Sequence, residues 1–422
     1  MKKKKIALIC SEPIRQRMGG IGIRFVEFAR QLLKCGFQLV FICPELDSSA
    51  ELLLSGVELH RFSQNSLLQQ LQECSCAIAQ GQLANNLVLG VPDLPSVIDL
   101  YDPWLVENFQ YFDVLGYVPY GNDHTSWRLQ MSRGDFFLCS SEEQRLFYLG
   151  FLTALGRVHP ELEKRDPDFQ SLITPVPFGV PDVLPPYQPL IPRSRTTEKR
   201  LLFGGLYDWY DPWTLLYSLE QLGDLDWTLL FMKNPNPETT PQQLFQEVEN
   251  WAHSKGYHSS KIQFLDWVPA ERRYDLFRDV DVLVAPHLLN IETRLSFRTR
   301  ILEALAAGCA VITTDTGLLS RLIKEHSAGW VVPEKDVSIL NRTIRQVLTD
   351  QGLVLSRKKN AQHLAQSFHW SRTMEPLIKF CTDPRRDTTK TDFSFDPGTR
   401  SPRNSLYFRL KHFTKRIRSR CG

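Results

Sequence analysis

The stretch IALICSEPIRQRMGGIGIRFVEFARQLLKCGFQLVFICP (6–44) places two short apolar runs on either side of an amphipathic segment. Residues 6–10 and 37–44 are predicted to be strands, because each is a continuous apolar run of strand length. Residues 21–35 carry apolar side chains at helical spacing, and Gly36 is placed to end that helix. A strand, a helix and a second strand in this order are typical of a parallel α/β sheet.

The same alternation continues toward the C-terminus. Further buried strands are predicted over 76–80, 95–100, 135–140, 200–205, 227–232, 262–266, 280–286 and 309–315, and helices over 296–307, 337–349 and 369–381. The proline-dense stretch 173–192 separates the two series and is typical of an interdomain connector. We therefore expect an α/β chain made of two Rossmann-like, doubly wound parallel-sheet domains.

Two such domains would place the functional site between them, because ligands of doubly wound sheets bind beyond the carboxyl ends of the strands. We assign residues 1–186 to the first domain, 187–198 to a linker and 199–368 to the second domain. Residues 369–382 are assigned to a closing helix. Residues 383–422 are expected to form a disordered and basic amphipathic tail.

Composition narrows the class of protein. A chain of 422 residues suits two domains, and a net charge of +3 gives no bias toward nucleic acid, so no nucleic-acid partner is expected. No apolar stretch is long enough to span a membrane, and the apolar run behind Lys2–Lys5 is too short for a signal peptide. Nine dispersed cysteines without metal-site spacing are typical of reduced thiols, so we expect a cytoplasmic protein with no metal site.

The C-terminal end carries a different signal. Residues 383–402 are polar, with little to bury, which predicts disorder. Residues 404–420 interleave Leu, Tyr, Phe and Ile with Arg and Lys and contain no acidic residue. A basic amphipathic segment of this kind suits an anionic membrane surface, so peripheral association with the inner membrane face is expected.

Two long segments resemble the glycosyltransferase family 4 group of the GT-B superfamily. They are MGGIGIRFVEFARQLLKCGFQLVFICP (18–44) and SFRTRILEALAAGCAVITTDTGLLSRLIKEHSAGWVVPEKD (296–336), with smaller echoes at 174–182 and 368–381. The resemblance implies a GT-B fold with an acceptor-side first domain and a donor-nucleotide second domain. It implies transfer of a sugar from a nucleoside-diphosphate sugar to an acceptor hydroxyl, with retention and without a metal or other cofactor. Together with the basic tail, it implies a lipid-linked or polysaccharide acceptor, as in surface polysaccharide or glycolipid assembly.

Three glycines precede or open the first predicted helix. Gly19, Gly20 and Gly22 would let backbone amides approach a phosphate at a helix N-terminus. The resemblance implies contact with the distal phosphate or the sugar of the donor. A turn whose glycines serve only its conformation is the alternative. A dinucleotide fingerprint fits less well, because the glycines come late after the strand and only Glu45 lies near the end of the second strand.

Glu303 is the strongest single candidate for donor binding. The resemblance implies that its carboxylate accepts hydrogen bonds from the nucleotide ribose, which suits a diol. The alternative is an ion pair with Arg300 on a solvated helix face. The chain departs from the family pattern at Leu295, where a second glutamate is usual, although Glu292 lies three residues upstream. A further departure is Gly205, which stands at the position of the usual arginine.

We hypothesise that an arginine cluster replaces the missing basic residues. Arg294, Arg298 and Arg300 surround the start of the predicted helix 296–307. Cations there oppose the helix dipole, and a bound diphosphate would reverse that cost and use the forked donors of arginine. The alternative is a set of exposed surface arginines.

Asp99 and Asp102 end the strand predicted over 95–100 and are the candidate catalytic residues. A carboxylate at that edge could orient or deprotonate the acceptor hydroxyl. A helix cap or turn is the alternative for Asp102. Two rival functions also stay open at this point: a degenerate GT-B protein that binds sugar nucleotide or a partner without turnover, and a sugar-nucleotide epimerase of the same fold.

Overall fold

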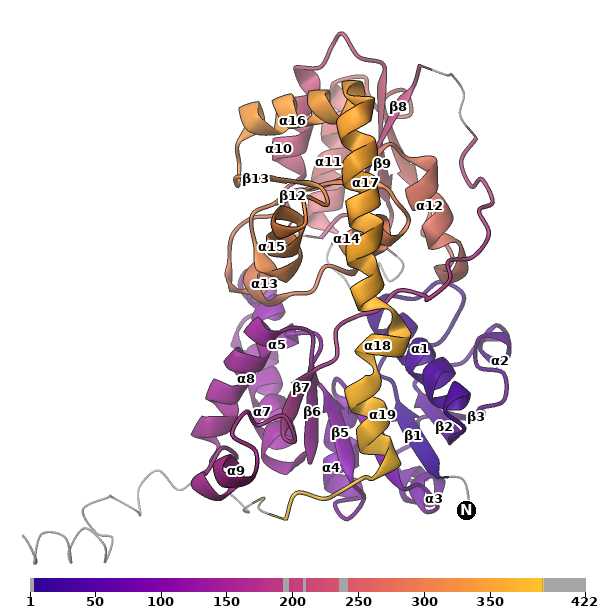
Figure 1. Ribbon diagram of the computed structural model, residues 1–422, viewed down its shortest axis with the longest axis vertical. Coiled ribbons are helices and arrows are strands. Elements are labelled where there is room, and N and C mark those ends of the chain that lie inside the picture. The colour runs from indigo at the N-terminus through magenta and orange to yellow at the C-terminus, as the bar shows by residue number, and fades with distance from the viewer. Residues whose placement is uncertain (1–3, 193–196, 208–209, 235–241, 389, 391–422) are drawn as a thin grey trace, which may run out of the picture.

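The computed structural model describes residues 4–192, 197–207, 210–234, 242–388 and 390. They form two α/β domains stacked one above the other (Figure 1). The predicted architecture is confirmed, since each domain contains a parallel sheet of Rossmann type. The tail beyond Lys390, including the basic segment 404–420, lies outside the described residues.

The first domain is built on a seven-stranded sheet of order β3-β2-β1-β4-β5-β6-β7. All of its pairings are parallel. Its strands are β1 (Lys5–Ile9), β2 (Gln38–Cys43), β3 (Glu58–Arg61), β4 (Cys76–Gln80), β5 (Ser96–Asp99), β6 (Phe136–Cys139) and β7 (Ile173–Pro175). The strand order reverses direction between β1 and β4, which is where doubly wound sheets bind ligands.

The second domain repeats the design with six parallel strands of order β10-β9-β8-β11-β12-β13. They are β8 (Lys199–Gly205), β9 (Trp227–Met232), β10 (Ile262–Leu265), β11 (Val282–Ala285), β12 (Ala310–Thr314) and β13 (Trp330–Val332). Most of these strands are buried apolar runs, as expected for a parallel sheet covered on both faces.

Helices connect the strands. In the first domain they are α1 (Gly20–Lys34), α2 (Ala50–Leu53), α3 (Leu67–Leu71), α4 (Leu83–Gly90), α5 (Trp104–Glu107), α6 (Phe112–Leu115), α7 (Tyr117–Arg133), α8 (Glu142–Ala154) and α9 (Pro160–Arg165). In the second they are α10 (Pro212–Glu220), α11 (Gln243–Ser254), α12 (Arg273–Asp279), α13 (Ile291–Leu295), α14 (Thr299–Ala306), α15 (Gly317–Glu325), α16 (Val337–Thr349) and α17 (Gln351–Ala365). No helix in the described ranges is long and apolar enough to cross a bilayer.

The chain returns to the first domain at its end, through α18 (Trp370–Thr373) and α19 (Glu375–Thr382), which lie against the lower domain in Figure 1. The Trp370 ring is fully buried, with its centroid 5.0 Å from that of Phe178 and 6.2 Å from that of Phe28. Gly179 makes this possible, because a Cβ there would lie 2.5 Å from the indole. The closing segment therefore completes the core of the first domain.

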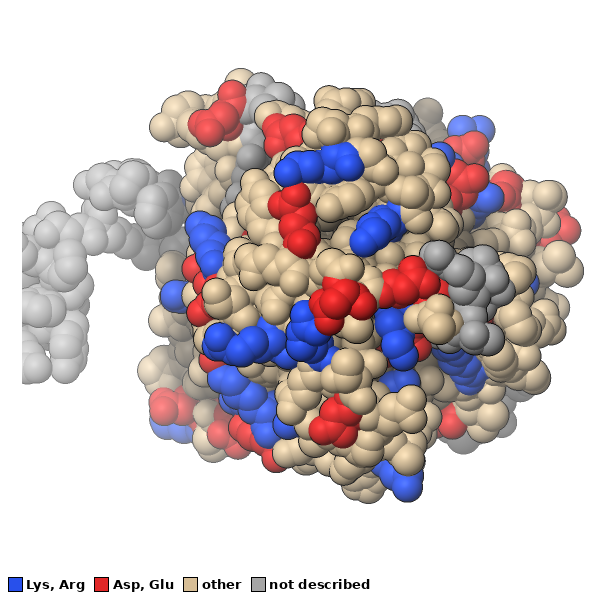
Figure 2. Space-filling model, turned by 90° about the horizontal axis from the view of Figure 1, so that it is seen from above, with Lys and Arg blue, Asp and Glu red and all other residues tan. Residues whose placement is uncertain are grey.

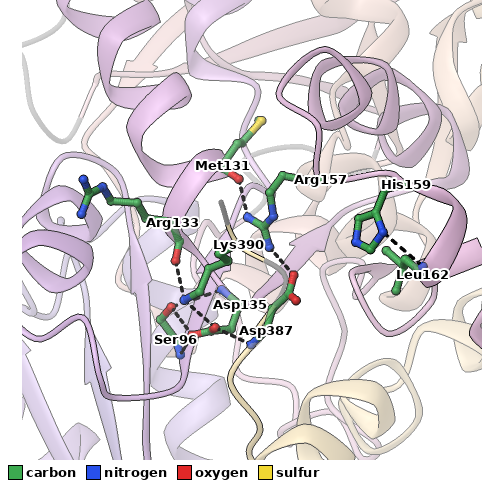
Figure 3. A network of polar contacts seen from close by, with 9 residues as sticks. All are labelled: Ser96, Met131, Arg133, Asp135, Arg157, His159, Leu162, Asp387 and Lys390. Carbon is green, nitrogen blue, oxygen red and sulfur yellow. Dashed lines mark hydrogen bonds and ion pairs between the residues drawn. The ribbon is translucent and has the colours of Figure 1, made fainter. Parts of the chain in front are cut away.

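Residues after α19 also dock on the first domain (Figure 3). Asp387 receives a hydrogen bond from the buried Arg157 guanidinium at 2.7 Å, and its amide donates to Asp135 Oδ1 at 2.7 Å. Lys390 Nζ lies 2.6 Å from the same Asp135 oxygen. The prediction of disorder from residue 383 onward is therefore wrong for residues 383–388 and Lys390, because two buried charges find their partners there.

Charge on the outer surface is mixed. Seen from above, Lys and Arg lie among Asp and Glu rather than in one patch (Figure 2). This face therefore carries no patch of one charge that would steer a charged ligand. The charges that bear on ligand binding are those inside the cleft.

Candidate active site

A cavity of about 650 Å³ lies between the two domains. Its walls come from both of them, so Gly20 and Glu303 face a common space as the sequence hypothesis requires. The residues used below that line it are Glu12, Gly19, Gly20, Tyr101, Asp102, Glu107, Gly204, Gly205, Tyr207, Tyr210, Arg273, Glu292, Arg298, Arg300 and Glu303. The size is that of a small-molecule site.

Arg300 points from α14 to the end of β8. Its Nη1 donates to the backbone oxygens of Phe203 at 3.0 Å and Gly205 at 3.2 Å. Gly204 has φ of +93°, and a Cβ there would lie 2.9 Å from Arg300 Nη1. Gly204, next to the Gly205 that stands at the position of the usual arginine, thus makes room for a guanidinium supplied by another element.

The cleft arginines keep nitrogen atoms available. Arg300 Nε and Nη2 and Arg298 Nε are buried and find no hydrogen-bond partner among the described residues. The Arg300 guanidinium carbon lies 3.9 Å from the centroid of Tyr210. Burial lowers the pKa of Arg300, and the nearby Arg298 adds to this effect. A dianionic ligand would supply the missing acceptors and relieve that repulsion.

Arg298 is held by Glu292, with Nη2 2.5 Å from Oε2. Burial alone would lower the pKa of Arg298, but Glu292 outweighs it, so the net shift is upward. Glu292 is itself buried, and Ser296 donates a hydrogen bond to its other oxygen at 2.5 Å. Ser296–Arg298 separate α13 from α14, so the single helix predicted over 296–307 begins three residues later. This remodelled turn brings Glu292 to the cavity.

His287 stands behind the arginines at the end of β11. The ring is 1% exposed and packs edge-on to Tyr210, with centroids 5.1 Å apart. Burial lowers the pKa of His287 well below its usual value, and Arg298 and Arg300 lower it further. The imidazole is therefore neutral and adds no competing charge.

Glu303 forms a different ion pair from the one considered in the sequence. Its Oε1 lies 2.5 Å from Nη2 of Arg273, at the start of α12, rather than pairing with Arg300. Burial raises the pKa of Glu303 to about 7, with Arg273 opposing part of the rise. The carboxylate lines the cavity as one half of this ion pair.

The glycine loop is engaged by the chain itself. The Glu12 carboxylate accepts a hydrogen bond from the amide of Gly22 at 2.6 Å and another from the amide of Gly19. Gly19 and Gly20 line the cavity, whereas Gly22 lies in the first turn of α1. The amides of Gly19 and Gly22 are thus not open to a phosphate in this structure.

The two candidate aspartates separate. Asp99 is buried and forms a two-pronged ion pair with Arg24, at 2.7 and 3.0 Å, so it is not among the residues that line the cavity. Asp102 does line it and makes no cap to α5, whose N-cap is Pro103. Asp102 hydrogen-bonds Glu107, and burial raises the pKa of both carboxyls, that of Glu107 further because Asp102 adds its charge. Asp102 and Glu107 thus form a hydrogen-bonded pair of carboxyl groups at the cavity wall.

Arg294 is the one member of the predicted arginine cluster that does not line the cavity. It is exposed on α13, because Glu292 and Leu295 take the inward positions of that short helix. The cavity residues that were not predicted include Glu12, Glu107 and Arg273. Glu12 and Glu107 had a signal in the sequence, since each is an acid soon after a predicted strand, whereas Arg273 is brought in only by tertiary packing.

Among the described residues, one group has metal-ligand composition. Glu249 and His253 of α11 and the nearby His258 bring ligand atoms within 4.8 Å of one another. The group is absent from the residues that line the cavity. It has no part in the cleft described above.

Residues 214–350 match the family model of the group 1 glycosyl transferases. The matched segment runs from within α10 through α16 and contains Glu303 and both cleft arginines. The second domain thus contains a group 1 glycosyl transferase domain, and the chain is a glycosyltransferase with the GT-B fold. The expectations of family, fold and enzyme class are confirmed at this level.

Solved structures agree on the fold of this glycosyltransferase. Sucrose-phosphate synthase (tll1590) from Thermosynechococcus elongatus is 14% identical, with a TM-score of 0.65 over 90% of this chain and 98% of that one. Anabaena Alr3699/HepE in complex with UDP-glucose is 16% identical, with a TM-score of 0.66 over 90% and 99%. WaaG, a glycosyltransferase involved in lipopolysaccharide biosynthesis, is 17% identical, with a TM-score of 0.62 over 90% and 100%. No curated protein sequence matches the chain.

Proposed function

We propose that this glycosyltransferase moves a sugar from a nucleoside-diphosphate sugar to an acceptor hydroxyl. The observation that carries the proposal is the pair of cleft arginines, whose buried nitrogens lack partners among the described residues and line the same cavity as Glu303. Arg298 and Arg300 would hold the diphosphate, and Glu303 would accept from the ribose. A UDP-glucose complex of a protein with this fold supports the choice of donor class.

The leaving diphosphate would be stabilised by fixed guanidinium groups. Charge that develops on a leaving group is best met by donors already in place in a site that excludes water. We therefore propose transfer without a divalent metal or other cofactor, and with retention of configuration as the family resemblance implies. Asp102, which lines the cavity with its hydrogen-bonded partner Glu107, would orient the acceptor hydroxyl.

We further propose that the acceptor is lipid-linked or a growing polysaccharide, in a cytoplasmic enzyme that binds the inner membrane face peripherally. The support is the basic, acid-free segment 404–420, together with residues 383–388 and Lys390, which fix the start of the tail to the first domain. The glycosyltransferase WaaG, which shares the fold, is involved in lipopolysaccharide biosynthesis.

A donor panel tests the proposal. Purified full-length protein is screened by thermal shift with nucleoside-diphosphate sugars, because a ligand of the native state raises the unfolding temperature. Stabilising donors are then assayed for transfer with and without EDTA. Arg298→Ala is expected to weaken donor binding by at least about tenfold, the loss of roughly one charge-assisted hydrogen bond. Arg294→Ala, its matched control outside the cavity, leaves affinity within about twofold.

The products separate the rival functions. Sugar transfer to an added acceptor, or slow donor hydrolysis without one, supports the proposed enzyme. Donor binding with no turnover under any condition indicates a binding subunit instead. Release of free nucleotide with an altered sugar in the absence of acceptor indicates an epimerase. Loss of activity in EDTA that is restored by a divalent metal would contradict the metal-independent mechanism.

A further inference from the structure

The N-terminus of α1 is occupied by a carboxylate of the chain itself. Glu12, in the loop between β1 and α1, accepts hydrogen bonds from the amides of Gly19 and Gly22. Gly19 is the N-cap and has no side chain to cap with, and the first turn of α1 contains no acidic residue. Glu12 therefore supplies the negative charge that a helix N-terminus favours.

Two of the three glycines make room for this carboxylate. A Cβ at Gly19 would lie 2.8 Å from Glu12 Oε1, and one at Gly22 would lie 3.1 Å from Oε2 and 3.0 Å from the sulfur of Met18. A Cβ at Gly20 would meet nothing within 4 Å. The glycine pattern is thus explained by close approach of Glu12, without an external phosphate.

Glu12 also acts on the cavity. Glu12 from the first domain and Tyr207 from the second both line it. Burial is the main reason that the pKa of Tyr207 is raised, and the charge of Glu12 contributes to the rise. The negative charge is therefore felt across the cavity, where a sugar moiety would lie between the two walls.

We propose that Glu12 is a specificity-determining residue that excludes anionic groups from the first-domain wall and leaves it to neutral sugar hydroxyls. The inference rests on the proposed function and deepens it. Because Glu12 holds the amides of Gly19 and Gly22, these amides do not serve the diphosphate, which Arg298 and Arg300 would hold. A uronate donor or a phosphorylated acceptor would bring a second anion toward the half-buried Glu12, and the two like charges would repel each other.

The test compares two probes that differ in one carboxylate. UDP-glucose and UDP-glucuronate are titrated by calorimetry into the full-length protein, its Glu12→Gln and Glu12→Ala variants, and Glu45→Gln. Glu45 is an exposed acid that also lines the cavity, so its variant is the control for loss of one charge. The wild type is expected to prefer UDP-glucose by at least about tenfold. Glu12→Gln is expected to reduce this preference by at least about tenfold through tighter binding of UDP-glucuronate, while Glu45→Gln keeps it.

Several results would overturn the proposal. An unchanged preference in Glu12→Gln removes the specificity role. Tighter binding of UDP-glucose itself to Glu12→Gln would show that the donor normally displaces the Glu12 carboxylate from the glycine amides. If neither UDP-glucose nor UDP-glucuronate binds the wild type or any variant, the proposed function fails. The role of Glu12 is then tested by titrating the proteins with inorganic phosphate. Glu12→Ala must then bind one phosphate more than the wild type, and equal stoichiometry contradicts the inference. Thermal unfolding establishes that each variant is folded, and Glu12→Gln carries the test if the alanine variant is not.

Discussion

Replacing Arg300 by alanine removes the guanidinium that lies over Tyr210 and reaches the end of β8. One nitrogen, Nη1, is used by the backbone oxygens of Phe203 and Gly205, and this anchors the side chain. Nε and Nη2 find no partner in the described part of the chain. These two atoms are therefore the ones that a donor diphosphate would engage.

The expected loss follows from those two nitrogens. A hydrogen bond to a charged group contributes about 1.5–3 kcal/mol. Two of them, allowing for incomplete additivity, contribute about 3–5 kcal/mol, which raises Kd by about two to four orders of magnitude. Arg300→Lys keeps a positive charge but loses the forked geometry, so about one order of magnitude should be recovered.

The assay is calorimetric titration of UDP-glucose, or of the best donor in the panel, into the three proteins. Unfolding temperatures are compared first, because Arg300→Ala also removes the anchor to β8. Arg294→Ala serves as the control, since it removes the same charge from an exposed position on α13. A folded Arg300→Ala protein that binds the donor as tightly as the wild type would refute the assignment of the diphosphate to this wall.

Three further predictions concern other parts of the molecule. Affinity for UDP-glucose should rise several-fold between about pH 6 and pH 8, because Glu303, with its pKa raised to about 7, offers both oxygens as acceptors to the ribose diol only when ionised. Glu303→Gln should flatten this profile, and a wild-type profile already flat would contradict the prediction. Asp387→Asn should reduce the free energy of unfolding in urea by about 1–3 kcal/mol, because buried Arg157 loses its charged partner. The matched Asp383→Asn variant, whose ion pair is exposed, should lower the free energy of unfolding by under about 0.5 kcal/mol. Equal losses in the two variants would be inconsistent with a role for burial. Deleting residues 391–422 should abolish cosedimentation with anionic vesicles, since each basic residue near the surface contributes about 1 kcal/mol, and unchanged cosedimentation would disprove a membrane role for the tail.

Most of the buried strands were predictable, because each is a continuous apolar run in the sequence. The three strands that were missed lack that signal. Strand β3 reads ELHR and lies partly exposed at the sheet edge, whereas β7 and β13 are only three residues long. They are defined by pairing with a neighbouring strand. That strand is distant in the sequence, so the local residues do not reveal the pairing.

A site residue was predictable when the helix or strand that carries it is enough to bring it to the cavity. Glu303, Arg298 and Arg300 come to the cavity because α14 points one end at it. Asp99 could not be separated from Asp102 by sequence, because its partner Arg24 is 75 residues away. Glu12 could not be recognised as the ligand of the glycine amides, because the loop conformation between β1 and α1 decides that contact.

The burial of Trp370 beside Phe28 and Phe178 has a consequence for biosynthesis. A ribosome releases the first domain long before the residues that finish its interior, so this domain must wait for nearly the whole polypeptide before it acquires its final stability. A fragment ending near residue 186 would expose aromatic rings. It would also leave Asp135 and Arg157 without their ion-pair partners, Lys390 and Asp387. We expect such a fragment to aggregate when produced alone, and to be rescued by a separately supplied peptide covering residues 369–390.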